Sequence, residues 1–470
     1  MPPDPRVARW GAIAVGCLLV LAALAIYALT YVDRYYDHFV WQAAAFLEGH
    51  AAIRYPVEAA NGLNGNAYFQ DVLPIATTDG IARGLLPFPP LPALVLLPFV
   101  ALWGLATNDQ AIFTVFAAVD VAICWWAIGR LPVGPAVRLG TTVFFAFGTV
   151  FWYTAQTSTT WYQAHIVAVG LTFLAIGLAV RADPAAVDGE PPPSTGPTSA
   201  RSLRGALAID PRQFVVGLLF GLACTARLSV VFGAPFFAFV GSGDGWRRRA
   251  WSAGLGAAVP ILGLVLFDVI TTGQVVNPAY DHLYRLETAA YPRLGYHADW
   301  GIEDPRYLLQ NLGIALFAVP DILPARLPDA LALAPVPVCT APGALRGLFD
   351  VSCPLAVPRD TGMSVLLTSP AYLLAIPVLG RFGRSTFVTG AVLAVGAIAL
   401  FDLIHFSQGW VQFGYRFSND AAPFAVVLVA LGFERLAVRR RWGMLLGMSL
   451  VVVSLAINAW GVIWSRSLGW

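Results

Sequence analysis

Long apolar stretches alternate with short polar ones along almost the whole chain. Many of these stretches approach the 20 or so residues that a helix needs to cross a bilayer. The pattern predicts an all-α polytopic membrane protein, a single bundle over residues 1–470 with about 11–13 transmembrane or re-entrant helices. The expected runs are 10–31, 85–106, 110–130, 133–153, 163–181, 212–240, 250–271, 306–320, 364–380, 385–404, 420–437 and 442–464.

Arginines gather on one side of this predicted bundle. Because basic residues collect in cytoplasmic loops, "WRRR" at 246–249 and "RRR" at 439–441 indicate the cytoplasmic side and, with Arg6 and Arg9, a cytoplasmic N-terminus. Residues 182–211 contain a Pro/Gly/Ser-rich stretch and are expected to be a disordered cytoplasmic linker. The loops that fall on the opposite, extracytoplasmic side are 32–84, 154–162, 272–305, 321–362 and 405–419.

Three runs need separate interpretation. Residues 10–31 resemble a signal peptide, but their length and the lack of a small-residue cleavage site favour an uncleaved spanning helix. Residues 85–106 begin in a proline-rich turn and are expected to form a membrane-embedded juxtamembrane or re-entrant helix. Residues 212–240 have arginines at both ends, which predicts two half-helices broken near Arg227.

Composition agrees with the bilayer as the solvent. The chain is 58% hydrophobic and 12% charged, and its 15 tryptophans and 15 tyrosines suit membrane interfaces. A net charge of +2 gives no sign of a nucleic-acid-binding face. The sequence contains no lysine, so any phosphate contact must come from arginine, tyrosine, histidine or backbone N–H groups.

The first extracytoplasmic loop carries candidate catalytic carboxylates. Asp33, Asp37 and His38 follow the first run directly, and the next residues, "FVWQAAAFLEGH", have the pattern of a juxtamembrane helix lying along the interface. A partly desolvated carboxylate at this depth gains basicity and can act as a general base. Asp71 is a third candidate in the same loop. The simpler alternative is that these charges only mark the end of a helix.

Other loops on the same side offer candidate substrate-binding side chains. Arg416 beside Tyr415 is suited to a phosphate, whereas Asn419 and Asp420 look like an ordinary helix N-cap. Arg227 lies in an apolar run, where an arginine needs a partner or an aqueous cavity. The polar turn at 156–169 and the loop 272–305 are expected to line a sugar-sized site or close over it, although a packing histidine at 165 and a solvated loop would look the same. The candidates in these two segments are Trp161, Gln163, His165, Tyr280, His282 and Arg293.

The five cysteines divide by depth. Cys17, Cys124 and Cys224 lie in apolar runs and are interpreted as small packing residues. Cys339 and Cys353 share an extracytoplasmic loop, which predicts a disulfide. No motif requires a metal, although the acidic groups outside the membrane are compatible with Mg²⁺ or Mn²⁺.

The order of the segments adds a resemblance to a known family. "AAFLEGH", "PFPPLPALVLLPFVALWG", "TTWYQAHIVAV", "GLLFGLACTARLSVVFGAPF", "LLTSPAYLLAIPVLG" and "GWVQFGYRFSNDAAPF" together resemble bacterial GT-C glycosyltransferases of the protein O-mannosyltransferase and aminoarabinose transferase branch. The resemblance spans roughly residues 10–437. It implies a sugar donor on polyprenyl phosphate, a glycan, lipid or protein acceptor, and a site at the outer face of the bacterial plasma membrane.

The resemblance also assigns roles to residues. It makes an aspartate after the first helix the general base, with Asp37 preferred to Asp33 and Asp71. Some relatives place a lysine near the donor phosphate, so Arg416, Arg83 or Arg293 would have to substitute for it here. Two other functions stay open: a transporter or flippase of a lipid-linked sugar, which Arg227 and Asp268 at depth would favour, and a non-catalytic membrane scaffold.

Overall fold

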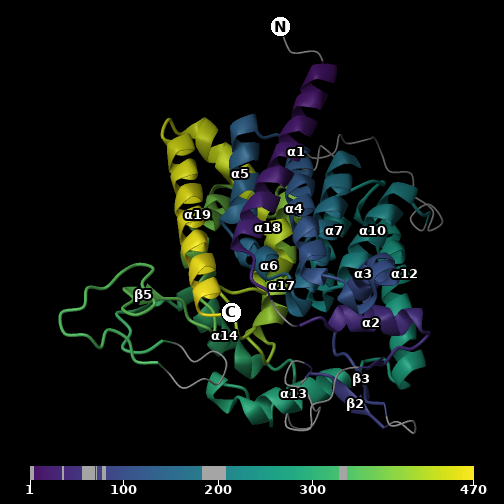
Figure 1. Cartoon of the computed structure of the whole chain (residues 1–470). Coiled ribbons are helices and arrows are strands. Elements are labelled where there is room, and N and C mark those ends of the chain that lie inside the picture. The colour runs from purple at the N-terminus through teal and green to yellow at the C-terminus, as the bar shows by residue number, and fades with distance from the viewer. Residues whose placement is uncertain are drawn as a thin grey trace.

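The computed structural model describes residues 5–33, 36–54, 69, 71–76, 81–182, 208–327 and 336–470. Within these ranges, seven helices are long and apolar enough to cross a membrane, and Figure 1 shows them as the upright body of the molecule. The prediction of an all-α polytopic membrane protein is confirmed. The seven helices are α1 (Pro5–Thr30), α4 (Asp109–Ile128), α7 (Thr160–Ala182), α12 (Trp246–Thr272), α17 (Thr386–Leu403), α18 (Ser418–Arg439) and α19 (Gly443–Ser467).

Shorter helices complete the bundle. The helices α5 (Pro135–Phe147) and α6 (Phe151–Thr157) meet at a 49° bend and together reach spanning length. The expected run at 364–380 is broken into α15 (Val365–Thr368), η6 (Pro370–Ala375) and α16 (Ile376–Leu379), with prolines at the start of both η6 and α16. The proline-rich segment leads into α3 (Leu91–Trp103), which contains Pro98.

The expected break near Arg227 is present. The helix α10 (Pro211–Cys224) ends just before Arg227, and the chain continues as η3 (Leu228–Gly233) and α11 (Pro235–Phe239). The Gln213 amide in the first turn of α10 donates to the carbonyl oxygen of Phe237, at 2.8 Å, in α11. The segment therefore turns back and returns to the level at which it began.

The predicted span at 306–320 is wrong. Residues 306–320 form only the ten-residue helix α14 (Leu308–Phe317). Ten helical residues rise about 15 Å, roughly half the thickness of a hydrocarbon core. The 3₁₀ turn at Pro305–Tyr307 precedes this helix and Pro320 follows it, so the apolar pattern is real but the helix is too short to cross.

Amphipathic helices and small sheets collect at one end of the bundle. Figure 1 shows α2 (His38–Leu47) and α13 (Ala279–Ala290) lying across this end, away from the N-terminus. Beside them β1 (Ile53–Arg54), β3 (Arg83–Leu85) and β2 (Leu73–Ile75) form an antiparallel sheet in that order, with Gly84 opposite Ile53 and Pro74. We call this the loop end of the bundle.

Glycines allow two of the helices to approach closely. A Cβ atom at Gly217 of α10 would lie 2.0 Å from the carbonyl oxygen of Ala253 in α12. A Cβ atom at Gly256 of α12 would lie 2.1 Å from the carbonyl oxygen of Phe214 in α10. Small residues of this kind permit backbone contact between membrane helices, where lipid removes the usual hydrophobic drive. This packing fixes α10 just before the break that carries Arg227.

Candidate functional site

A buried histidine and a carboxylate from the first loop meet at the head of α7. His38 is the first residue of α2, and its Nε2 lies 2.8 Å from Asp71 Oδ1. Its Nδ1 lies 3.0 Å from the hydroxyl of Thr160, which donates in turn to the carbonyl oxygen of Tyr36 at 2.8 Å. With the hydroxyl proton used in this way, Nδ1 donates to Thr160. The hydrogen bond between Nε2 of His38 and Oδ1 of Asp71 then needs a second proton, which lies either on the imidazole or on the carboxyl group.

Aromatic rings enclose this pair. The ring of Trp161 lies 6.0 Å from the His38 ring, and Phe69 lies 4.8 Å from it. The second carboxylate oxygen of Asp71, Oδ2, is buried and has no hydrogen-bond partner among the described residues. The structure thus brings the predicted residues His38, Asp71 and Trp161 together, with one oxygen of Asp71 left to accept a proton or a hydrogen bond.

The two other candidate aspartates have different surroundings. Asp37 is the N-cap residue of α2 and is half-buried, whereas Asp33 is exposed. Burial raises the pKa of the Asp37 carboxyl group, an effect that the neighbouring His38 opposes. Because burial disfavours the carboxylate, it strengthens Asp37 as a base. Asp37 and Asp71 are therefore the better-placed carboxylates of the first loop.

Within the described ranges, Arg416 is a buried cation without a carboxylate partner. It is only 9% exposed, and its guanidinium carbon lies 5.3 Å from the centre of the Tyr162 ring and 5.4 Å from that of Phe417. Its Nε has no hydrogen-bond partner, and no carboxylate lies within 4.0 Å of its guanidinium in the described part of the chain. A buried charge normally requires a counter-charge, so this side chain is suited to bind an anion that is not part of the protein.

Glu287 lies close enough to Arg416 and Asp71 to interact with their charges, although it was not among the residues that the sequence indicated. It lies on α13 at helical spacing from the buried Tyr284 and from Tyr280. Burial raises the pKa of its carboxyl group to about 8; the positive charge of Arg416 opposes this effect and the negative charge of Asp71 adds to it. Glu287 is thus close enough to feel both charges, yet it forms no ion pair with Arg416 among the described contacts.

The partner of Arg227 is Asp420. Nη2 of Arg227 lies 2.6 Å from Asp420 Oδ2, and Nε of Arg227 lies 3.2 Å from Asp420 Oδ1. The same carboxylate accepts hydrogen bonds from Ser229 and contacts Nδ1 of His165 at 2.8 Å. Asp420 is the third residue of α18, whose N-cap residue is Phe417, so the interpretation of Asp420 as a helix cap is wrong.

Phe417 connects this network to the unpaired arginine. Its ring lies under both guanidinium groups, 5.2 Å from Arg227 and 5.4 Å from Arg416. Asp420 neutralises Arg227, whereas Arg416 has no such partner among the residues that the structure describes. The two arginines therefore differ in role: Arg227 and Asp420 hold α10, η3 and α18 together, and Arg416 offers a free positive charge.

The other predicted residues make their own contacts. Gln163 donates to Asp109 at 2.6 Å and to the carbonyl oxygen of Ser158 at 2.9 Å, which stabilises the start of α7. Arg83 lies in β3, opposite Arg54 of β1, and the guanidinium carbon of Arg293 lies 5.7 Å from the Trp410 ring centre. Tyr415 is buried, Nε2 of His282 has no partner among the described residues, and burial raises the pKa of the Tyr280 hydroxyl.

The loop end thus combines a buried guanidinium with the carboxyl groups of Asp37, Asp71 and Glu287. Such a set can bind a phosphate and accept a proton from a hydroxyl group. Within the described ranges, no three His, Cys, Asp or Glu side chains are arranged to hold a metal ion. Compared with known proteins, the chain matches no protein-family model, no curated protein and no solved structure.

Proposed function

We propose that this chain is a membrane glycosyltransferase of the GT-C type that takes a sugar from a polyprenyl-phosphate donor. The observation that carries the proposal is Arg416, a buried guanidinium without a carboxylate partner among the described residues, beside Glu287 and the first-loop carboxylates. A phosphate on a lipid carrier supplies the missing anion. The surrounding apolar helices leave the prenyl chain in lipid while the phosphate reaches the loop end.

In the proposed reaction Arg416 holds the donor phosphate through charge-assisted hydrogen bonds. The Asp37 carboxylate takes the proton from an acceptor hydroxyl group, and the hydroxyl oxygen attacks the anomeric carbon of the sugar. The bond from that carbon to the phosphate oxygen breaks, and polyprenyl phosphate leaves with the electron pair. Attack opposite the leaving group inverts the anomeric centre.

Asp71 is the second candidate for the base. Its contact with His38 fixes the carboxyl group, and its Oδ2 has no hydrogen-bond partner among the described residues, so this oxygen can accept a proton. The experiment below distinguishes Asp37 from Asp71. The acceptor is a glycan, lipid or protein hydroxyl group at the extracytoplasmic face of a bacterial plasma membrane. The arginine clusters at the other end of the helices support this orientation.

The test is binding and turnover of a panel of radiolabelled polyprenyl-phosphate sugars by the protein in lipid nanodiscs. Asp37→Asn is expected to keep donor binding and lose transfer by about 100-fold or more, because a general base contributes about that much. Asp71→Asn is measured beside it, and the exposed Asp33→Asn is the matched control. Parallel reactions with Mg²⁺, Mn²⁺ or a chelator show whether transfer needs a divalent cation.

Each result separates the candidate functions. Loss of transfer in Asp71→Asn alone moves the base to Asp71 and keeps the enzyme. Donor binding with transbilayer movement but no transfer indicates a flippase. Absence of donor binding across the panel, or equal transfer in all three variants, contradicts the glycosyltransferase.

A further inference from the structure

The segment 336–357, which we call the disulfide loop, extends sideways from the loop end of the bundle. Figure 1 shows it beside α19, with β5 (Ala356–Val357) paired to β4 (Asp321–Ile322) at its base. The expected bond between Cys339 and Cys353 is present and closes the loop across 14 positions of sequence.

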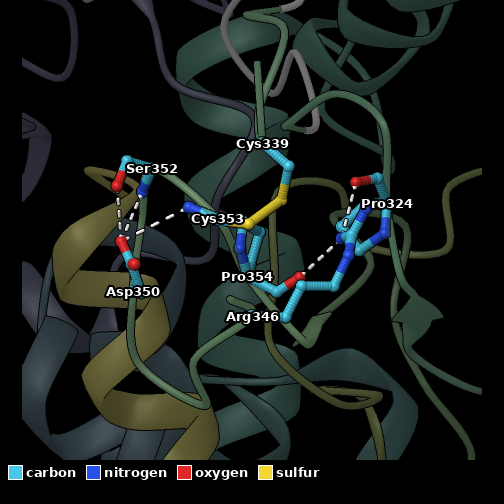
Figure 2. The surroundings of a disulfide bond; sticks show 7 residues. All are labelled: Pro324, Cys339, Arg346, Asp350, Ser352, Cys353 and Pro354. Atoms are coloured by element: carbon cyan, nitrogen blue, oxygen red, sulfur yellow. Dashed lines mark hydrogen bonds between the residues drawn. A yellow bond between two sulfur atoms is a disulfide. The ribbon is translucent and has the colours of Figure 1, made fainter. Parts of the chain in front are cut away.

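The two charged side chains of the disulfide loop bond to backbone groups. Figure 2 shows Arg346 donating to the carbonyl oxygens of Pro324, at 3.0 Å, and Pro354, at 2.7 Å. Asp350 accepts hydrogen bonds from the N–H groups of Ser352 and Cys353. The loop is therefore shaped by polar contacts to backbone groups, and Asp350 stays exposed beside the tip.

The tip instead presents large apolar side chains. Leu345 is 90% exposed, Leu348 is 50% exposed and Phe349 is 48% exposed. Moving leucine and phenylalanine side chains out of water lowers the free energy, and here three such side chains lie within five consecutive residues. The described neighbours leave all three largely uncovered.

The depth of the tip is set by α19. Trp464, in the last two turns of this spanning helix, donates through its indole N–H to the carbonyl oxygen of Leu348 at 3.0 Å. Because Trp464 lies three residues before the end of this candidate span, its partner Leu348 lies at the level where the helix leaves the membrane. The apolar tip therefore lies level with the end of α19, near the boundary between headgroups and acyl chains.

We propose that the tip of the disulfide loop, Leu345 to Phe349, inserts into the lipid leaflet at the loop end of the bundle. Lipid is the occupant that fits an apolar tip at interface depth, and the one charged side chain within the tip, Arg346, is bonded to two carbonyl oxygens. The disulfide and the Arg346 contacts hold the tip in shape without a large core beneath it, which limits the freedom that the loop loses on insertion. This anchor does not depend on the glycosyltransferase proposal.

The experiment places an environment-sensitive thiol label at Leu345→Cys in a Cys17→Ser background, because Cys17 is exposed whereas Cys124 and Cys224 are buried. The protein is reconstituted in nanodiscs of phosphatidylethanolamine and phosphatidylglycerol that contain nitroxide-labelled lipid, with the native disulfide verified by mass spectrometry. Ala298→Cys, an exposed position in the loop that carries Asp299 and Glu303, is the matched control.

Nitroxide lipid is expected to quench the label at 345 at least about threefold more than the label at 298, and aqueous iodide is expected to quench it less. Phe349→Cys supplies a second position if Leu345→Cys does not fold. Equal quenching at both positions, by lipid and by iodide, overturns the proposal. Shielding from both quenchers also overturns it, because a protein and not lipid would then cover the tip.

Discussion

Arg227 and Asp420 form a buried ion pair across 193 positions of sequence, with 2.6 Å between Nη2 and Oδ2. The Asp420 side chain is fully buried, and the guanidinium of Arg227 comes from the break between α10 and η3. His165 and Ser229 bind the same carboxylate. The pair therefore ties the broken helix to α18, directly below the loop that carries Arg416.

Removing one partner of this pair is expected to destabilise the fold. Arg227→Met leaves a fully buried carboxylate without its main counter-charge, and loss of one partner of a buried pair costs about 3–5 kcal/mol. We expect a clear drop in Tm, measured by thermal unfolding in detergent. The double variant Arg227→Met/Asp420→Leu removes both charges and is expected to recover much of the loss.

An exposed pair provides the control. Arg285 and Asp281 on α13 are 2.7 Å apart, but both side chains are exposed, so Arg285→Met is expected to leave Tm nearly unchanged. If Arg285→Met lowers Tm as much as Arg227→Met, burial is not what gives the inner pair its importance.

Replacing Arg416 is expected to weaken ligand binding without lowering Tm, unlike replacing Arg227. Arg416→Met removes an unpaired buried charge, so Tm is expected to stay the same or to rise. Affinity for polyprenyl phosphate is expected to fall about 10–100-fold, because charge-assisted hydrogen bonds to the phosphate are lost. Binding is measured with polyprenyl phosphate alone, which needs no knowledge of the sugar.

The control for Arg416 is an arginine that already has a carboxylate. Arg359 pairs with Asp321 at 2.9 Å on the exposed part of the loop region, and Arg359→Met is expected to bind polyprenyl phosphate as the wild type does. A stable Arg416→Met protein with unchanged affinity would remove the anion-binding role from Arg416.

Glu287 predicts a pH dependence of donor binding. With the pKa of its carboxyl group raised to about 8 by burial, Glu287 is neutral at pH 7 and leaves the charge of Arg416 free for a phosphate. As the pH rises through about 8, the carboxylate forms, competes for Arg416 and repels the phosphate. We expect the Kd for polyprenyl phosphate to rise above pH 8 in the wild type and to stay flat in Glu287→Gln.

The raised pKa of Glu287 also predicts how the stability of the fold changes with pH. Between the ordinary glutamate pKa and about 8, the folded state holds a proton on Glu287 that the unfolded state releases. Stability contributed by this proton is present below the ordinary pKa and is lost as the pH rises to about 8. The Tm of Glu287→Gln relative to the wild type is therefore expected to increase between pH 5 and pH 8, and an unchanged difference would contradict the shifted pKa.

The sequence was sufficient for features that depend on local pattern. Run length predicted the helical bundle, and the arginines at both ends of 212–240 predicted the break near Arg227. The residues after the first helix form the juxtamembrane helix α2, as their pattern predicted. The disulfide followed from the paired cysteines in one loop. In each case the residues that decide the structure are neighbours in the chain or share one short segment.

Long-range contacts could not be predicted in this way. Asp420 looked like a helix cap because its partner, Arg227, belongs to a distant segment. Glu287 was passed over because loop 272–305 is polar throughout, and only its helical spacing with Tyr284 gave a signal. The apolar run at 306–320 misled because hydropathy does not reveal where a helix ends.

The glycine contacts between α10 and α12 predict a strong effect from a single methyl group. Gly217→Ala places a Cβ atom 2.0 Å from the carbonyl oxygen of Ala253, so the two helices must separate and Tm is expected to fall. Gly254→Ala, on the exposed side of α12, meets nothing within 4 Å and is expected to keep or raise Tm through about 0.5–1 kcal/mol of helix propensity. Thermal unfolding of both variants in one detergent checks this, and equal Tm values would show that the close approach does not hold the helices together.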